Sequence, residues 1–181
     1  MDDALIIAKF AEESTREEAF RLLLKKYQQK IYWHVRRMVI DHDDADDVVQ
    51  DVFVKVWRNL EKFREDSQLY TWLYRIATNE CITFLNKKKQ KQNVSLDEED
   101  SSYLSDTLTA SSYFNGDVAQ MKLQQALLKL PEKQRLVFNM KYFEDLKYEE
   151  ISEIVGTSIG ALKASYHLAV KKIELFFRSN D

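Results

Sequence analysis

Glycine and proline are scarce in this chain, with three glycines and one proline among 181 residues. Sheet-rich folds need both residues, because their many tight turns require the backbone angles that glycine and proline supply. Alanine, leucine, lysine, glutamate and glutamine fill much of the remaining sequence, and all five are strong helix formers. The sequence therefore predicts an all-α protein with short connections.

Apolar residues recur at three- and four-residue steps, the spacing of one helical face. Pro131 and Gly156 punctuate the second half of this pattern. Proline suits the first turn of a helix, and glycine suits a tight turn with positive φ. The predicted helices cover residues 19–38, 45–60, 69–85, 118–130, 132–142, 148–155 and 158–177.

Residues 92–117 differ from both flanks, because Asn, Ser, Asp, Thr and Gly dominate there. Leu96, Leu104, Tyr113 and Phe114 are scattered through this stretch without a period. A segment of this length exceeds the usual connection inside a compact domain. It predicts a flexible tethering linker, although its apolar residues could instead dock on a partner. The expected division is a helical domain at 1–91, the linker at 92–117 and a second helical domain at 118–181.

The chain shows no sign of export or membrane insertion. The opening Met1–Ala11 is too short and too charged for a signal peptide, and no segment approaches eighteen consecutive apolar residues. Cys81 is the only cysteine, which excludes an internal disulfide and fits a reducing compartment. We expect a cytoplasmic protein that is not inserted in a membrane.

The overall charge is mildly acidic, with a net charge of −3 and a sequence pI of about 5.7. An independent DNA-binding domain is usually basic, so strong duplex binding by the whole chain is not expected. Acidic and basic residues are however segregated into runs, so one surface can repel DNA while another accepts it.

The two short predicted helices around Gly156 have the spacing of a helix-turn-helix. On the second helix, Lys163, His167 and Lys171 fall at four-residue steps, away from the apolar face that carries Leu162. A recognition helix meets bases and phosphates through such a face. The alternative is a helical hairpin with a solvated basic stripe, and spacing alone leaves it open.

Aspartates cluster at the start of the second predicted helix: Asp43, Asp44, Asp46, Asp47 and Asp51. Carboxylates near a helix N-terminus are favoured by its positive end, which accounts for one or two of them. The excess suggests a basic protein partner, although a solvated face remains the simpler interpretation. No histidine or carboxylate spacing matches a known metal site, so no metal is expected.

An aromatic cluster precedes and enters the third predicted helix, beside Arg64 and Arg75. Aromatic rings next to cations suit unstacked single-stranded bases. Core packing is the competing interpretation, and for Trp72 and Tyr74 it is normally the stronger one. The cluster comprises Phe63, Tyr70, Trp72 and Tyr74.

The sequence shows no residue pattern typical of a catalytic site. Cys81 lies in an apolar helical pattern typical of a core residue. His34, His42 and His167 have no nucleophile or carboxylate at a recognisable spacing, and no phosphate-binding glycine loop is present. We expect a protein that is not an enzyme and needs no cofactor.

Three ordered segments resemble a known family. Asp44–Phe53 is similar to the core-polymerase-binding helix of sigma factor domain two, and Phe63–Asn79 resembles the promoter-melting segment of the same domain. Leu130–Lys172 resembles sigma domain four, which reads the minus-thirty-five element. Their order, with a linker between them, resembles the extracytoplasmic-function (ECF) sigma factors.

The resemblance implies a function and its partners. Such a factor binds core RNA polymerase and directs promoter recognition, DNA melting and transcription initiation, and it is often held by an anti-sigma factor. By position, the implied polymerase-binding residues are Asp44, Asp46, Asp47, Gln50 and Asp51. The implied minus-ten residues are Phe63, Ser67, Gln68, Tyr70, Trp72, Asn79 and Thr83. The implied minus-thirty-five residues are Ser158, Lys163, Ala164, His167, Lys171 and Lys172.

The recognition helix departs from the pattern of many relatives, which carry arginines where Ser165 and Leu168 stand. Weaker or differently specific duplex binding is the expected consequence. Two other functions remain open at this point: an independent helix-turn-helix regulator of duplex DNA, and a helical interaction scaffold without a DNA role.

Overall fold

A computed structural model describes residues 1–111 and 114–180, and within them every regular element is helical. The prediction of an all-α fold is confirmed. The N-terminal helices are α1 (Asp3–Ala11), α2 (Arg16–Val39), α3 (His42–Asn59) and α4 (Leu69–Lys91), with short 3₁₀ turns η1 (Glu13–Thr15) and η2 (Leu60–Lys62). The C-terminal helices are α6 (Val118–Leu128), α7 (Glu132–Tyr142), α8 (Tyr148–Val155) and α9 (Ile159–Ser179).

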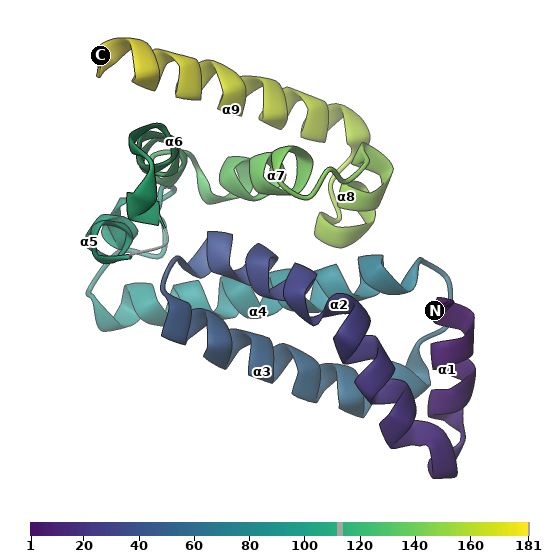
Figure 1. Ribbon diagram of the computed structural model, residues 1–181. Helices are drawn as coiled ribbons and strands as arrows, with labels where there is room; N and C mark the ends of the chain where they lie inside the picture. Colours follow the sequence, from purple (N-terminus) through teal and green to yellow (C-terminus); the bar gives the residue numbers. More distant parts are fainter. Residues whose placement is uncertain (112–113, 181) are drawn as a thin grey trace.

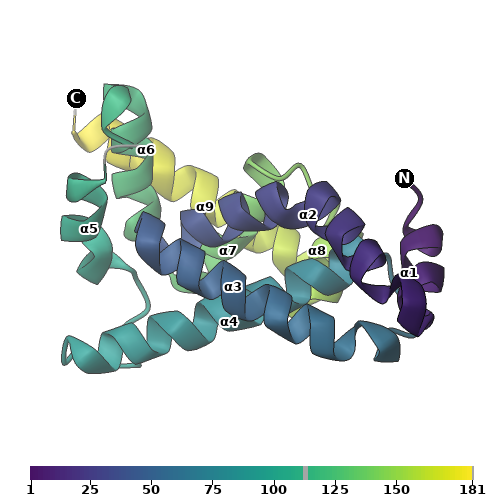
Figure 2. The same ribbon diagram turned by 60° about the horizontal axis from the view of Figure 1, so that its bottom comes forward.

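The two groups of helices pack against each other (Figures 1 and 2). Helices α2, α3 and α4 lie together, and α1 packs on the N-terminal part of α2. Helices α7 and α8 lie between this layer and α9, which runs along the side of the molecule remote from α2, α3 and α4. None of the helices in the described part of the chain is both long enough and apolar enough to span a membrane.

A strained corner joins α2 to α3 and sets where the acidic helix begins. Ile40 has φ 73° and ψ −50°, and the Asp41 N–H donates to the Val39 carbonyl at 2.9 Å. This is a γ-turn of the rare kind, which costs energy for a β-branched residue. Burial of the Ile40 side chain and a 2.7 Å hydrogen bond from Arg36 Nε to its carbonyl hold the turn. Asp41 then caps α3 by accepting from the Asp44 N–H at 2.9 Å.

The main apolar core crosses from the N-terminal helices into α7 and α8. Leu136 and Met140 of α7, with Ile151 of α8, join the cluster built by α1–α4. A smaller cluster lies between α6, α7 and α9 and consists of Ala126, Leu127, Leu130, Phe138, Ala169 and Ile173. Part of the apolar surface of α7 and α8 is therefore covered by the N-terminal helices.

The segment connecting the two groups is more ordered than its composition indicates. It forms η3 (Ser102–Leu104), α5 (Ser105–Ala110) and η4 (Phe114–Gly116). Leu104, Leu108 and Phe114 are buried, whereas Leu96 is 53% exposed. Polar composition concealed this burial because the apolar residues follow no period. Tyr113, singled out with them, lies outside the described residues.

Backbone hydrogen bonds tie this segment to the C-terminal helices. The Ser101 N–H donates to the Leu128 carbonyl at 2.8 Å, and the Glu132 N–H donates to the Glu99 carbonyl at 2.7 Å. The buried Lys89 at the end of α4 donates to the Glu98 carbonyl at 2.8 Å. These hydrogen bonds thus hold the first part of the connecting segment against both groups of helices.

His34 is a buried titratable group in the N-terminal core. Its Nε2 lies 2.9 Å from Thr78 Oγ1, and its ring packs edge-on against Tyr74 with centroids 5.0 Å apart. Burial, and secondly the charge of Arg37, lower the pKa of His34 to about 3. The imidazole is therefore neutral in the folded protein at any physiological pH.

The folding free energy should depend on pH through His34. Between about pH 6.5 and pH 3 the unfolded chain binds a proton that the folded chain rejects, so stability falls as the pH falls, by at most about 1.4 kcal/mol per unit. The free energy of unfolding, measured in urea, should fall less between pH 7.5 and pH 5.0 for His34→Gln than for wild type. The matched control is His167→Gln at an exposed position of α9, which should keep the wild-type dependence. A pH dependence of stability in His34→Gln equal to that of wild type would contradict the assignment of this dependence to His34.

Candidate nucleic-acid and protein interfaces

A groove of about 1290 Å³ runs between α2 and α3. Helix α2 contributes the half-buried Phe20 and Trp33, and α3 contributes the exposed Val54 and Trp57. Trp57 is 39% exposed although it packs edge-on against Phe20 at 5.1 Å. Exposed aromatic side chains beside charged ones are typical of protein interfaces.

The acidic run is divided between two sides of α3. Asp46, Asp47 and Gln50 line the groove. Asp44 faces α4, where Lys88 Nζ lies 2.9 Å from its Oδ2, and Asp51 is exposed but does not line the groove. The structure therefore brings three of the five predicted polymerase-binding residues together with the aromatic side chains.

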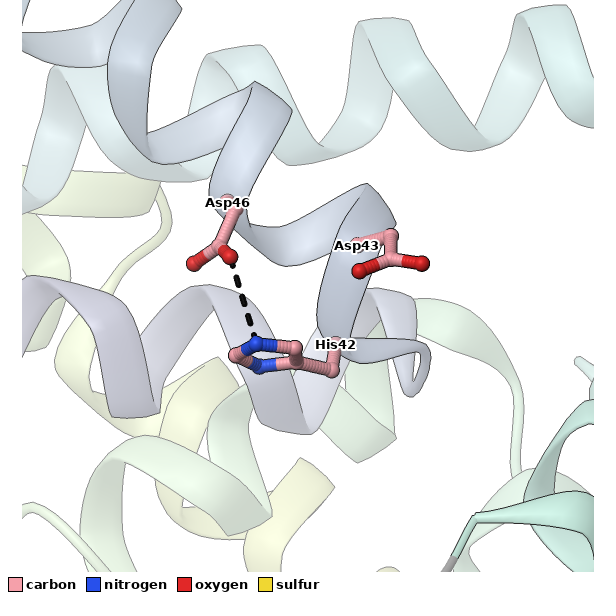
Figure 3. Close-up of side chains that lie close together, drawn as sticks. All are labelled: His42, Asp43 and Asp46. Carbon is pink, nitrogen blue, oxygen red and sulfur yellow. Dashed lines mark ion pairs between the residues drawn. The ribbon is translucent and has the colours of Figure 1, made fainter.

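His42, Asp43 and Asp46 gather at the start of α3 (Figure 3). One ligand atom of each lies within 4.8 Å of the others. The His42 ring is already engaged, with Nε2 3.3 Å from Asp46 and Nδ1 2.6 Å from the Tyr32 hydroxyl. All three side chains are exposed. The ion pair and the helix N-terminus account for this cluster without a metal ion.

The loop before α4 borders a cavity of about 450 Å³. Three of the predicted minus-ten residues, Phe63, Ser67 and Gln68, line it. Asp3 of α1 and Glu153 of α8 lie on its other walls. Carboxylates at the walls disfavour phosphate groups, so the cavity is poorly suited to DNA in this arrangement.

The remaining predicted minus-ten residues fall on two sides of α4. Trp72, Asn79 and Thr83 are seven and four residues apart, so they share one side, and Asn79 and Thr83 are exposed. The Trp72 ring lies 5.3 Å from Phe63, which joins this side to the loop. Tyr70 lies on the other side, and its hydroxyl donates to Glu150 of α8. Burial and this carboxylate raise the pKa of Tyr70 to about 12.

Helices α8 and α9 form the expected helix-turn-helix. Gly156 adopts φ 71°, the left-handed conformation that the sequence predicted for it. The Ser152 hydroxyl donates to the Thr157 carbonyl at 2.6 Å, which fixes the turn. Ser158 caps α9 by accepting from the Ala161 N–H at 3.3 Å.

The predicted minus-thirty-five residues lie on the exposed side of α9. Ser158, Lys163, Ala164, His167, Lys171 and Lys172 are all exposed. Lys172 donates to Gln134 of α7 at 3.2 Å, and Lys163 Nζ lies 5.8 Å from the centre of the Tyr148 ring. These two lysines border the helix face, because both lean toward neighbouring helices.

A buried guanidinium connects the two groups of helices. Arg135 of α7 is 1% exposed, and its Nη1 donates to the Arg37 and Met38 carbonyls at 3.0 Å each. These carbonyls belong to the last turn of α2, which carries the negative end of the helix dipole. Burial lowers the pKa of Arg135 from its ordinary value. Its Nε and Nη2 have no hydrogen-bond partner among the described residues, so the contact is incompletely satisfied.

A carboxylate in the turn between α7 and α8 holds the groups together at a second point. Glu144 forms an ion pair with Arg37 of α2, and the Tyr74 hydroxyl of α4 donates to it at 3.0 Å. Burial raises the pKa of Glu144 above its ordinary value, although Arg37 and Tyr74 both act in the opposite direction. Desolvation thus offsets part of the attraction between the two charges.

Helix α8 covers one side of α4. Glu150 caps α8 by accepting from the Lys147 N–H at 2.9 Å, and its other oxygen accepts from Tyr70. Arg75 donates twice to the Glu153 carbonyl, at 2.6 and 3.1 Å. Tyr70, Tyr74 and Arg75 are therefore all engaged by the C-terminal helices.

Sequence reasoning did not identify the aromatic lining of the α2–α3 groove. Trp57 falls within the helix predicted over 45–60, where apolar periodicity predicts a core residue. Trp33 falls outside the stripe predicted over 19–38, and that departure was the available signal. The contacts of Arg135 and Glu144 join residues about a hundred positions apart, for which a single sequence gives no signal.

Comparisons with known proteins agree with this architecture. The profile of Sigma-70 region 2 matches residues 23–91, and that of Sigma-70 region 4 matches residues 120–173. These two matches define the chain as a sigma factor.

Similar proteins narrow the class. The RNA polymerase sigma-H factor of Pseudomonas aeruginosa is 32% identical over 165 residues, which cover 87% of this chain and 86% of the relative. The ECF RNA polymerase sigma factor SigW of Bacillus subtilis is 34% identical over 162 residues, covering 83% and 84%. The ECF sigma-E factor of Escherichia coli K12 is 32% identical, covering 87% and 86%. The chain belongs to the ECF sigma factors.

Two solved structures share the fold. CnrH in complex with the cytosolic domain of CnrY has a TM-score of 0.70 and 22% identity, and 99% of each chain is covered. RpoE in complex with the anti-sigma factor NepR from Bartonella quintana has a TM-score of 0.70 and 21% identity, covering 90% of this chain and 98% of the other.

Reversing the charge of Glu144 should separate the two groups of helices. In Glu144→Lys an ammonium faces Arg37, and breaking a buried pair costs about 3–5 kcal/mol. The radius of gyration from small-angle X-ray scattering should rise, and amide exchange over residues 70–78 should accelerate, at unchanged helix content.

The matched control is Glu149→Lys, which makes the same charge change at an exposed position of α8. It should leave both measurements at their wild-type values. If Glu144→Lys gave the same radius of gyration and the same amide exchange rates as this control, the ion pair would have no role in holding the two groups of helices together.

Proposed function

We propose that this sigma factor docks on core RNA polymerase through the α2–α3 groove and directs it to promoters. The observation that carries the proposal is the coincidence of Asp46, Asp47 and Gln50 with the exposed Trp57 and half-buried aromatic side chains in one groove. Aromatic contacts supply affinity at a protein interface, and the carboxylates select a basic partner and steer it into register. Asp51 extends this surface at its border, and Asp44 has a smaller part because Lys88 already pairs with it.

Two further surfaces carry promoter recognition in this proposal. Phe63, Ser67 and Gln68, with the Trp72, Asn79 and Thr83 side of α4, receive the unstacked minus-ten strand, and Tyr70 joins them when α8 moves away. Stacking of a base on an aromatic ring contributes about 1–3 kcal/mol, which offsets the cost of unpairing. The exposed basic face of α9, with Ser158, Lys163, Ala164, His167, Lys171 and Lys172, receives the minus-thirty-five duplex.

Promoter binding by the free chain is weak for two reasons. The net charge is −3, and Glu150 and Glu153 of α8 lie against the part of α4 where DNA is expected. Binding to polymerase would separate the two groups, and each weak promoter contact would then gain from the effective concentration provided by the other. The protein acts as a non-catalytic specificity factor in the cytoplasm.

An anti-sigma factor is the third partner in this proposal. The support is a likeness of fold to CnrH and RpoE, whose structures contain CnrY and NepR. Such a partner would compete with polymerase for the same chain.

Charge reversal at Asp47 tests the docking surface. Wild-type protein should co-elute with core RNA polymerase in stoichiometric amounts, and Asp47→Lys should weaken the complex at least about tenfold, because it places a cation toward a basic partner. Trp33→Ala should weaken it as well. Asp44→Asn should have a smaller effect than Asp47→Asn, because Lys88 already neutralises Asp44.

The control is Asp97→Lys, which makes the same charge change at an exposed position of the connecting segment. If wild type bound promoter duplexes but not core polymerase, the alternative of an independent helix-turn-helix regulator would replace this proposal. An equal loss of polymerase binding in the Asp97→Lys control would show that binding depends only on the net charge of the chain.

A further inference from the structure

The outward face of α9 differs in chemistry from its flanks. Leu162, Ala169 and Ile173 are buried and define the inward side of the helix. At about 100° per residue, Ala164 lies directly opposite them, and Leu168 lies within about 40° of Ala164. Leu168 is 47% exposed, which is unusual for a leucine surrounded by polar positions. The centre of the outward face is therefore apolar at Ala164 and Leu168, and Lys171, about 20° from Ala164, places a cation at the centre in the next turn.

Cations border this apolar centre. Lys163 and His167 lie on one side of Ala164 and Lys172 on the other, and all three are exposed. Their positions suit contacts with the two phosphate backbones that flank a major groove. Figure 1 shows α9 on the side of the molecule remote from α2–α4, so no other helix group covers this face.

The apolar centre restricts what the helix can read. Alanine and leucine side chains offer neither donors nor acceptors, so they cannot bind the hydrogen-bonding edges of guanine, cytosine or adenine. The only apolar group that a base presents in the major groove is the C5 methyl of thymine. Gly160 lies on the same side of the first turn with open space around it, which permits the helix to approach the bases closely.

From this geometry we infer that Leu168, with Ala164, is a specificity determinant that reads thymine methyl groups in the minus-thirty-five element. The inference rests on the proposed function and adds the chemical identity of the sequence read. Each methyl group buried against these side chains contributes about fourfold in affinity, from about 0.8 kcal/mol per buried carbon group. The basic flanks position the helix on the phosphate backbones.

Uracil replacement tests this inference, because uracil pairs as thymine does but lacks the methyl group. Holoenzyme made from the full chain and core polymerase would first select promoters from a duplex pool randomised at both elements. Selected minus-thirty-five elements should contain thymine, and replacing those thymines with deoxyuridine should weaken promoter binding about fourfold for each methyl contacted.

The variant Leu168→Ala should lose most of the sensitivity to uracil while it still initiates transcription. Leu175→Ala is the matched control, since Leu175 is an equally simple exposed leucine, 60% exposed, two turns further along α9. That control should keep the wild-type ratio between thymine and uracil templates.

Three results would overturn the inference. Initiation with no dependence on the methyl groups would leave the proposed function intact and remove this specificity. Equal methyl dependence in wild type and Leu168→Ala would do the same, as would selected elements read through guanine alone. Failure of the holoenzyme to initiate on any selected template would overturn the proposed function and this inference together.

Discussion

The guanidinium of Arg135 at the end of α2 is the contact on which the arrangement of the two helix groups depends. Its Nη1 satisfies two terminal carbonyls of α2 that would otherwise be buried by α7 without a partner. The same group leaves Nε and Nη2 unsatisfied and is fully enclosed, so the contact is specific in geometry but costly in desolvation. The ion pair between Glu144 and Arg37 likewise combines a specific geometry with a desolvation cost. The geometry of the interface is therefore well defined, and its polar contacts carry a desolvation cost.

This interface engages one of the two helices for which we propose DNA contacts and leaves the other exposed. The exposed side of α9 is free in the packed chain, whereas Tyr70, Tyr74 and Arg75 of α4 are engaged by the turn before α8 and by α8 itself. Backbone and carboxylate oxygens of the C-terminal group accept hydrogen bonds from the α4 side chains that would otherwise face solvent. The groove between α2 and α3 lies outside this contact, so docking at the groove does not require the interface to open first.

Much of the fold and part of the site could be predicted from the sequence. Helices α1 and α5 were not predicted, whereas the other helices followed from apolar periodicity and from Gly156, whose positive φ was anticipated because no side chain tolerates that turn as well. The acidic run was recognised as a surface, but only the packing of α3 on α4 showed that Asp44 leaves it to pair with Lys88. Burial of Leu104 and Leu108 was hidden because short helical turns have no period. The partners of Arg135 and Glu144 depend on long-range packing, which residue spacing cannot reveal.

The short turns of the connecting segment also determine how far the two groups can travel from each other. Elements centred about 25 base pairs apart on B-form DNA are separated by about 85 Å. A fully extended chain of roughly 25 residues reaches at most about 80–90 Å, a length comparable with that separation. Each turn of η3, α5 or η4 that persists shortens this reach. The segment thus limits how far apart the two groups can lie, and insertions or deletions within it would change that limit.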